Sequence, residues 1–194
     1  MQIVQPSAAL IDNVNRDEIY QKLERCGKVS RLSKLGDPEN FIRSIIKRGH
    51  ESVLEHVNLT FHIVCDRAIM SELTRHRHAS FTVESTRYLK YTDLKVIAPT
   101  LNAIDKNSFK QLVRAVQDEQ YGFLLKAGYS PDVARSMLPL CTKSELYMTA
   151  NLREWRHIIK VRTAPDAHPQ IRLIIGQVRD IIADQLPVIV EDLL

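Results

Sequence analysis

The clearest structural signal in the chain is a segment in which apolar side chains stand at every second position. It runs from Val57 to Cys65, and polar residues occupy most of the positions between. A repeat of two residues is the period of a β-strand with one buried face. Asp66 follows directly and can cap a helix that runs into Arg75. The segment therefore predicts a strand followed by a helix.

Helices account for most of the remaining pattern. Asp37-Pro38 and Ser130-Pro131 have the form of helix starts, with an N-cap residue and proline at the first position. Asn151 opens another helix, with a glutamate three residues on as in a capping box. Apolar residues at helical spacing also mark residues 107–127 and 169–186, while residues 2–12, 85–90 and 94–98 have weaker strand character.

Strands and helices do not alternate regularly along the chain. This favours an α+β fold, with a mainly antiparallel or mixed sheet packed against several helices, over a doubly wound sheet. At 194 residues the chain is long enough to bury a sizeable core. We therefore expect residues 1–194 to form a single domain.

Composition excludes several classes of function. A net charge of +4 and an aromatic content of 6% are weak evidence for nucleic-acid binding, and we expect no nucleic-acid partner. The three cysteines are far apart and form no CxxC pair, which favours a reducing compartment. The first residues lack the pattern of a signal peptide, and no apolar run has the length of a membrane span. We expect a soluble, cytoplasmic protein with no membrane partner.

Residues 75–88 contain an unusual density of hydrogen-bond donors. Arginines at 75, 77 and 87 offer planar forks that suit phosphate or carboxylate oxygens. Histidines at 76 and 78 add groups that donate or accept according to protonation. The segment predicts a binding site for an anionic, phosphorylated small molecule.

Other chemistries are less well supported by the residues. The histidines occur without an HExxH pattern or an aspartate cluster, so we expect no metal site. Cys26, Cys65 and Cys141 lack a recognisable activating context. Ser85 lies beside a glutamate but has no GxSxG elbow, so ligand binding is favoured over a nucleophilic role. Glycine-rich nucleotide loops of the Rossmann or P-loop type do not occur.

Several ordered motifs together resemble one known family. Arg75-His76-Arg77, then seven residues, then Ser85 resembles the RHR-x7-S signature of flavin-dependent thymidylate synthases. His50-Glu51-Ser52 with Glu55-His56 is similar to an upstream segment of that family. Further blocks resemble its C-terminal part and follow in its order: Val133-Ala134-Arg135, Asn151-Leu152-Arg153-Glu154-Trp155-Arg156-His157 and Val161-Arg162.

The resemblance implies a single catalytic domain that converts dUMP to dTMP by reductive methylation. Methylenetetrahydrofolate would supply the carbon, and FAD reduced by NADPH would supply the hydride. The family resemblance also implies a homotetramer with shared active sites. The folate and the flavin carry the difficult chemistry, so the protein mainly orients its ligands, and no activated cysteine is needed.

The resemblance also implies roles for individual residues. Arg162 would be catalytic, because it matches an arginine that polarises the uracil ring, and His50 would lie near the folate. Residues matched to flavin binding are Ser52, Arg75, His76, Arg77, His78, Asn151, Leu152, Arg153 and His157. Residues matched to dUMP binding are Glu72, Arg75, Glu84, Ser85, Thr86, Arg87, Arg135 and Arg162.

Two departures from the family pattern concern ligand contacts. Many members carry Glu or Gln two residues before the serine, where this chain has Val83, and Glu84 follows one residue later. Residues 163–170 also differ from the compact run found in other members. Two other functions stay open: a non-catalytic nucleotide- or RNA-binding protein, and a flavoprotein that acts on another pyrimidine substrate.

Overall fold

The computed structural model describes residues 1–31, 34–91, 93–99 and 105–194. The chain divides into two compact units, each assembled from separate segments. Unit 1 comprises residues 1–7, 63–75 and 82–146, and unit 2 comprises residues 8–62, 76–81 and 147–194. The boundary between the units falls within four strands, β2 (Ser7–Leu10), β3 (Asn58–Asp66), β4 (Ala79–Val83) and β6 (Lys143–Asn151). The expectation of a single catalytic domain stays a prediction.

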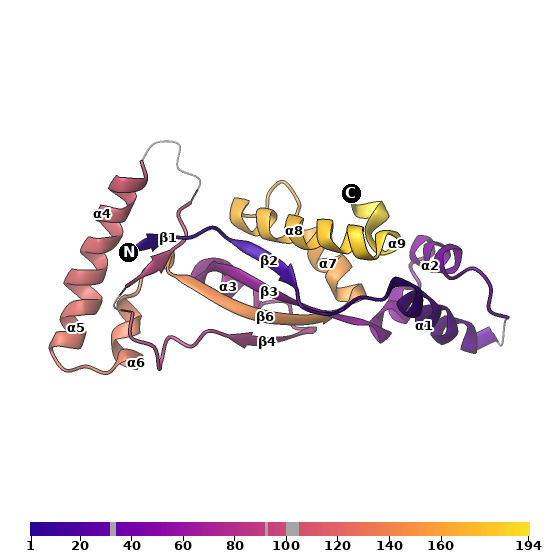
Figure 1. The fold of residues 1–194 in the computed structure, drawn as a ribbon, viewed down its shortest axis with the longest axis horizontal. Helices are drawn as coiled ribbons and strands as arrows, with labels where there is room; N and C mark the ends of the chain where they lie inside the picture. Colours follow the sequence, from indigo (N-terminus) through magenta and orange to yellow (C-terminus); the bar gives the residue numbers. More distant parts are fainter. Residues whose placement is uncertain (32–33, 92, 100–104) are drawn as a thin grey trace. The chain divides into compact units, whose positions relative to one another are not determined.

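The main sheet has four strands in the order β2-β3-β6-β4, where β2 is Ser7–Leu10. It is antiparallel, and a second sheet pairs β1 (Gln2–Ile3) with β5 (Lys95–Val96) in parallel. Side chains of β3 alternate between buried and partly buried, as the sequence period predicts. The predicted α+β class, with a mainly antiparallel or mixed sheet, is confirmed (Figure 1).

The core of unit 2 is formed where helices pack on strand residues. Trp155 is fully buried; its indole N–H donates to the Leu59 carbonyl at 3.0 Å, and its ring meets Phe61 edge-on. Ala8 of β2 donates to the Gln177 side chain at 2.8 Å, which joins strand to helix. Burial of a large side chain such as that of Trp155 contributes about 2–3 kcal/mol to stability. The helices of unit 2 are α1 (Arg16–Lys28), η1 (Val29–Arg31), α2 (Pro38–Lys47), η2 (Glu51–His56), α7 (Leu152–Arg162), α8 (Pro169–Gln185), α9 (Pro187–Val190) and η5 (Glu191–Leu193).

Unit 1 has a separate, smaller core. Leu94, Val96, Val113, Tyr121 and Leu138 are buried together. The apolar stripe predicted for residues 107–127 lies on α4 and α5, with a π-helical turn between them (Figure 1). The helices of unit 1 are α3 (Arg67–Leu73), α4 (Lys106–Val116), η3 (Gln117–Tyr121), α5 (Gly122–Lys126), α6 (Pro131–Ala134) and η4 (Arg135–Met137).

Helix starts agree with the capping patterns in most cases. The side chains of Asp37, Asp66 and Asn151 each accept a backbone N–H three residues on. Gly49 ends α2 with a φ of +70°, a conformation that favours glycine. Ser130 has the extended backbone of an N-cap, but its hydroxyl donates to the Asp132 carboxylate and makes no capping bond.

One strand expectation was wrong, and one strand was not predicted. Residues 85–90 form turns and irregular backbone, and the strand lies just before them as β4. The long strand β6 was missed, although Ser144, Leu146, Met148 and Ala150 alternate as buried residues along it. Its period of two was present in the sequence. Among the described residues, no helix is both long and apolar enough to cross a membrane.

Candidate active site

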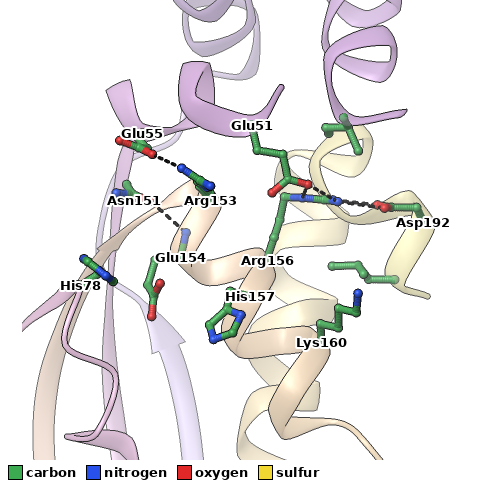
Figure 2. A pocket seen from close by; sticks show the side chains of 12 residues that line it. Glu51, Glu55, His78, Asn151, Arg153, Glu154, Arg156, His157, Lys160 and Asp192 are labelled. Carbon is green, nitrogen blue, oxygen red and sulfur yellow. Dashed lines mark hydrogen bonds and ion pairs between the residues drawn. The ribbon is translucent and has the colours of Figure 1, made fainter. Parts of the chain in front are cut away.

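Helix α7 carries four of the candidate residues of unit 2: Leu152, Arg153, His157 and Arg162. Its cap fixes the first turn, because the Asn151 side chain accepts the Glu154 N–H at 2.9 Å. One face of α7 is buried in the core, and polar residues of the other faces line a cavity of about 740 Å³ (Figure 2). The lining residues are Ile46, Glu51, Glu55, His78, Asn151, Arg153, Glu154, Arg156, His157, Lys160, Asp192 and Leu193.

Two ion-pair groups fix the walls of this cavity. The Arg153 guanidinium lies 2.6 Å from the Glu55 carboxylate, and both side chains are about half exposed. Arg156 is 6% exposed and pairs with Glu51 at 3.1 Å and with Asp192 at 2.7 Å (Figure 2). These two ion pairs join α7 to η2 and η5. They also supply the partners without which a buried guanidinium would be costly.

His76 is buried against α7, with 7% of its surface exposed. The Arg162 Nε–H donates to His76 Nε2 at 3.0 Å, and His76 Nδ1 lies 3.5 Å from a Glu154 carboxylate oxygen. Burial, with the nearby Arg162 and His157 as further causes, lowers the pKa of His76 to about 4. His76 is therefore a neutral hydrogen-bonding group near pH 7.

His50 and Ser52 contribute to a second cavity in unit 2, of about 390 Å³. Both are exposed at the start of η2. Lys28 and Arg48 lie on the same walls, so this cavity has a cationic lining. It suits an acidic or phosphorylated part of a ligand.

In unit 1, Glu84 is held on both carboxylate oxygens. Lys143 approaches one oxygen at 2.9 Å, and the Tyr91 hydroxyl donates to the other at 3.0 Å. Burial and then the Glu84 charge raise the pKa of Tyr91, so the phenol stays protonated. Lys143 also lies 2.9 Å from Glu145. Glu84 is thus a member of a fixed polar network.

The other predicted substrate residues of unit 1 are less constrained. Arg87 is exposed, and its backbone N–H donates to the Ser85 hydroxyl at 3.3 Å. Arg135 donates to the Thr86 hydroxyl at 3.2 Å, which brings together two residues far apart in the sequence. These side chains supply cationic and hydroxyl donors of the kind that bind a phosphate.

The remaining predicted residues have varied positions. Glu72 is half-buried near the end of α3, and its carbonyl accepts the N–H of the exposed Arg75 at 3.2 Å. Arg77 and His78 are exposed, and His78 lines the larger cavity. Leu152 is fully buried, and its N–H donates to the Val57 carbonyl, so its side chain belongs to the core.

Cys65 and Cys141 have the environments of structural residues. Burial raises the pKa of the Cys65 thiol to about 12, and burial also raises the pKa of the Cys141 thiol. A thiol so disfavoured as thiolate is a poor nucleophile. Within the described ranges, no three His, Cys, Asp or Glu side chains gather in a way that could hold a metal ion.

Sequence reasoning gave no role in a site to two residues that the structure places in polar networks: Glu154 and Lys143. Glu154 lies inside a block that resembles the family, but its pattern indicates only a capping box at the start of the helix. No local sequence pattern indicates a role for Lys143, because its partner Glu84 is 59 residues away in the chain.

Comparison with known proteins assigns the family. A family model described as thymidylate synthase complementing protein matches residues 7–188. A probable flavin-dependent thymidylate synthase of Mycobacterium phage D29 is 34% identical, over 89% of this chain and 84% of that protein. The flavin-dependent thymidylate synthase of Corynebacterium glutamicum is 32% identical, over 68% of this chain and 60% of that protein.

A solved structure agrees with the family assignment. The structure of a UMP/dUMP methylase, PolB, from Streptomyces cacaoi bound with 5-Br dUMP has a TM-score of 0.80 and 26% identity, and covers 98% of this chain and 96% of that one. The resemblance inferred from the ordered motifs is therefore confirmed, and this chain belongs to the thymidylate synthase complementing protein family, together with the flavin-dependent thymidylate synthases.

Proposed function

We propose that this protein catalyses the reductive methylation of dUMP to dTMP, with methylenetetrahydrofolate as carbon donor and FAD, reduced by NADPH, as hydride source. The proposal rests on family membership along residues 7–188. In the structure, the observation that carries it is the Arg162 guanidinium, held at 3.0 Å by a buried, neutral histidine. A guanidinium held in this way stabilises negative charge that develops on a uracil ring.

The larger cavity of unit 2 has the donors that a flavin cofactor needs. Amide, guanidinium and imidazole groups of Asn151, Arg153 and His157 line it, and His78 also lies on its wall (Figure 2). These groups suit the polar ring edge and the diphosphate of FAD. Bound FAD would supply the hydride. The proposed flavin-binding residues are Ser52, Arg75, His76, Arg77, His78, Asn151, Leu152, Arg153 and His157.

The exposed donors of unit 1 support phosphate binding. Arg87 and Arg135 would take the phosphate of dUMP, with the Ser85 and Thr86 hydroxyls beside them. Arg162 would stabilise the charge on the uracil ring. Glu72, Arg75 and Glu84 complete the proposed substrate set, and His50 would lie near the folate. We further propose that residues 1–194 form one catalytic domain that works as a cytoplasmic homotetramer with shared active sites.

The test is an assay of dTMP formation by the purified protein. Complete mixtures contain dUMP, FAD, NADPH and methylenetetrahydrofolate, and each component is then left out in turn. We expect a flavin absorbance spectrum in the purified protein, and no dTMP when dUMP, NADPH or methylenetetrahydrofolate is left out. Omission of FAD should abolish dTMP formation only after the copurified flavin has been removed. Protein that takes up no flavin when FAD is supplied would contradict the proposal. Affinity for single-stranded RNA that falls steeply with salt would instead support a nucleic-acid-binding function.

A second substrate follows from the structural comparison. The S. cacaoi protein, 26% identical, is named a UMP/dUMP methylase. The two nucleotides differ by one 2′-hydroxyl, so methylation of UMP is the alternative reaction for this chain. Competition between labelled dUMP and UMP in the same assay separates the two. Preferential methylation of UMP would favour the alternative.

A further inference from the structure

The side chains of Glu154, His76 and Arg162 in unit 2 form a continuous chain of contacts. Glu154 faces His76 Nδ1 at 3.5 Å, and His76 Nε2 accepts the Arg162 Nε–H at 3.0 Å. Glu154 is 9% exposed and His76 is 7% exposed. A carboxylate and an imidazole are costly to bury without polar partners, so the contacts among these three groups offset part of the cost of burying Glu154 and His76.

The position of the proton on His76 follows from its partner. Arginine stays protonated at all ordinary pH values, so the Arg162 Nε–H is always a donor. His76 Nε2 must therefore be unprotonated, and the proton of the neutral ring is on Nδ1. The nitrogen that carries this proton is the one that lies next to a Glu154 carboxylate oxygen. The distance of 3.5 Å is long for a hydrogen bond, but the negative charge still favours a proton on the nearer nitrogen.

The backbone explains why Glu154 lies in this place. Asn151 caps α7 by accepting the Glu154 N–H at 2.9 Å, which fixes the position of Glu154 in the first turn. Arg162 lies at the end of the same helix, eight residues on. His76 comes from the turn before β4 and bridges the two. Helix α7 thus sets the distance between the Glu154 carboxylate and the Arg162 guanidinium, and the His76 imidazole lies between them.

We propose that Glu154 and His76 are positioning residues, which hold the Arg162 guanidinium in one orientation toward the uracil ring and require a neutral His76. This inference rests on the proposed function, since it assigns the reaction to Arg162. Glu154 holds the His76 proton on Nδ1, and His76 in turn fixes Arg162 through Nε. Neither residue needs to touch the substrate to affect the rate.

The arrangement predicts an acid limit for activity. Among the residues that the structure describes, Glu154, His157 and Arg162, all on α7, are the titratable and charged groups that face the His76 ring. Protonation of Nε2 would set two donors against each other and release Arg162. Burial and the positive neighbours keep the pKa of His76 near 4, so the ring stays neutral well below pH 7.

The first test measures the tautomer directly, by nitrogen NMR of the flavin-loaded protein labelled with ¹⁵N-histidine. The chain has 7 histidines, and the His76→Gln variant identifies the His76 signals. We expect wild-type His76 to carry its proton on Nδ1 at pH 7. Glu154→Gln should loosen the contact between His76 and Arg162, so that part of the protein carries the His76 proton on Nε2. A wild-type His76 with its proton on Nε2 would overturn the proposal.

The second test measures dTMP formation under saturating dUMP. Glu154→Gln should lower kcat on the order of 10- to 100-fold through misplacement of Arg162, with little change in the KM for dUMP or in flavin content. Glu119→Gln makes the same chemical change at an exposed position of unit 1 and is the matched control. Full activity of a folded Glu154→Gln variant would overturn the positioning role.

Two further variants separate positioning from a merely structural effect. Glutamine at position 76 can still offer an acceptor to Arg162 but does not titrate, so His76→Gln should keep more activity than His76→Ala and lose the acid limb of the pH profile. In an Arg162→Lys background, Glu154→Gln should cost little more, because the group it positions is already altered. The proposal would be contradicted if the activity losses of Arg162→Lys and Glu154→Gln simply multiplied in the double variant. It would also be contradicted if the acid limb of the pH profile persisted in His76→Gln.

The two arms distinguish failure of this inference from failure of the proposed function. A wild-type enzyme that forms dTMP, with a Glu154→Gln variant of unchanged kcat, removes the positioning role alone. A wild-type protein that forms no dTMP removes the proposed function, and with it the role of this pair in that reaction, whatever tautomer NMR records.

Discussion

The candidate residues of unit 1 and unit 2 differ in how firmly the chain holds them. In unit 2, His76 is buried and accepts a hydrogen bond from Arg162 of α7, and Arg156 of α7 is buried and paired with Glu51 and Asp192. In unit 1, Ser85 and Arg87 lie in irregular backbone, and the Arg87 side chain is exposed. Unit 2 therefore presents pre-arranged groups, as stabilisation of a transition state requires. Unit 1 presents exposed cations, which suffice to bind a phosphate.

Glu84 is the exception within unit 1. Lys143 and Tyr91 hold its two oxygens, so it is as constrained as the groups of unit 2. Since Val83 stands where many family members have Glu or Gln, this network bears on whether Glu84 contacts substrate or supports the loop that carries Ser85. Substitutions in the two units should therefore have different effects on kcat, KM and stability.

The largest expected effect is the loss of Arg162. Arg162→Ala should reduce dTMP formation roughly 100- to 1,000-fold, because charge on the uracil ring would lose its stabilising donor. Flavin content and folding should survive. Rapid-quench measurement of dTMP, with the flavin spectrum as control, checks this result. Near-normal turnover would remove Arg162 from the chemistry and abolish the contrast between the units.

Acid should destabilise the wild-type protein through His76. The pKa of this group is near 4 in the folded chain and about 6.5 when unfolded, so the unfolded state binds the proton first as the pH falls. The free energy of unfolding should fall between about pH 6.5 and pH 4, by on the order of 3 kcal/mol. Denaturant unfolding of wild type and His76→Gln over this range isolates the contribution, since other groups titrate in both. Parallel curves would contradict it.

Arg87→Ala should act on substrate binding. A charged hydrogen bond contributes about 1.5–3 kcal/mol, so the KM for dUMP should rise about 10- to 100-fold with a smaller change in kcat. Steady-state kinetics measure both values. Arg114→Ala removes another exposed arginine of unit 1 and is the control. An unchanged KM in Arg87→Ala would remove Arg87 from the phosphate site.

Glu84→Gln should lower stability more than an exposed carboxylate change does. Lys143 would lose one of its two acidic partners but keep Glu145, so the cost should be about 1 kcal/mol. Thermal unfolding measures this cost, and Glu119→Gln is again the control. A KM for dUMP that rises while the melting temperature stays unchanged would identify Glu84 as a substrate ligand and not a support.

The smallest expected effect is that of the cysteines. Cys65→Ser and Cys141→Ser should retain activity where the protein folds, because raised pKa values leave little thiolate at pH 7. The dTMP assay together with circular dichroism checks this expectation. A folded but inactive variant would support a cysteine mechanism and place a reactive group in unit 1.

Local patterns predicted much of the fold. The alternation in β3 and the caps of α2, α3 and α7 depend on residues within a few positions of each other, so they could be read directly. The missed strand β6 had the same period, but its buried residues include Ser144 and Ala150, which carry a weak apolar signal. The family also followed from the sequence, because several spaced motifs occur in one order.

What the sequence by itself determined is the set of chemical groups: the donors of residues 75–88, the face of α7 and the family to which they belong. Which of these groups are paired, and with what, was decided only by tertiary structure. Glu154 and Arg162 have no recognisable link until His76, 86 residues before Arg162, lies between them. Hydrogen bonds and burial act over ångströms in space and leave no period in the sequence, so the protonation and orientation of this group follow from the fold alone.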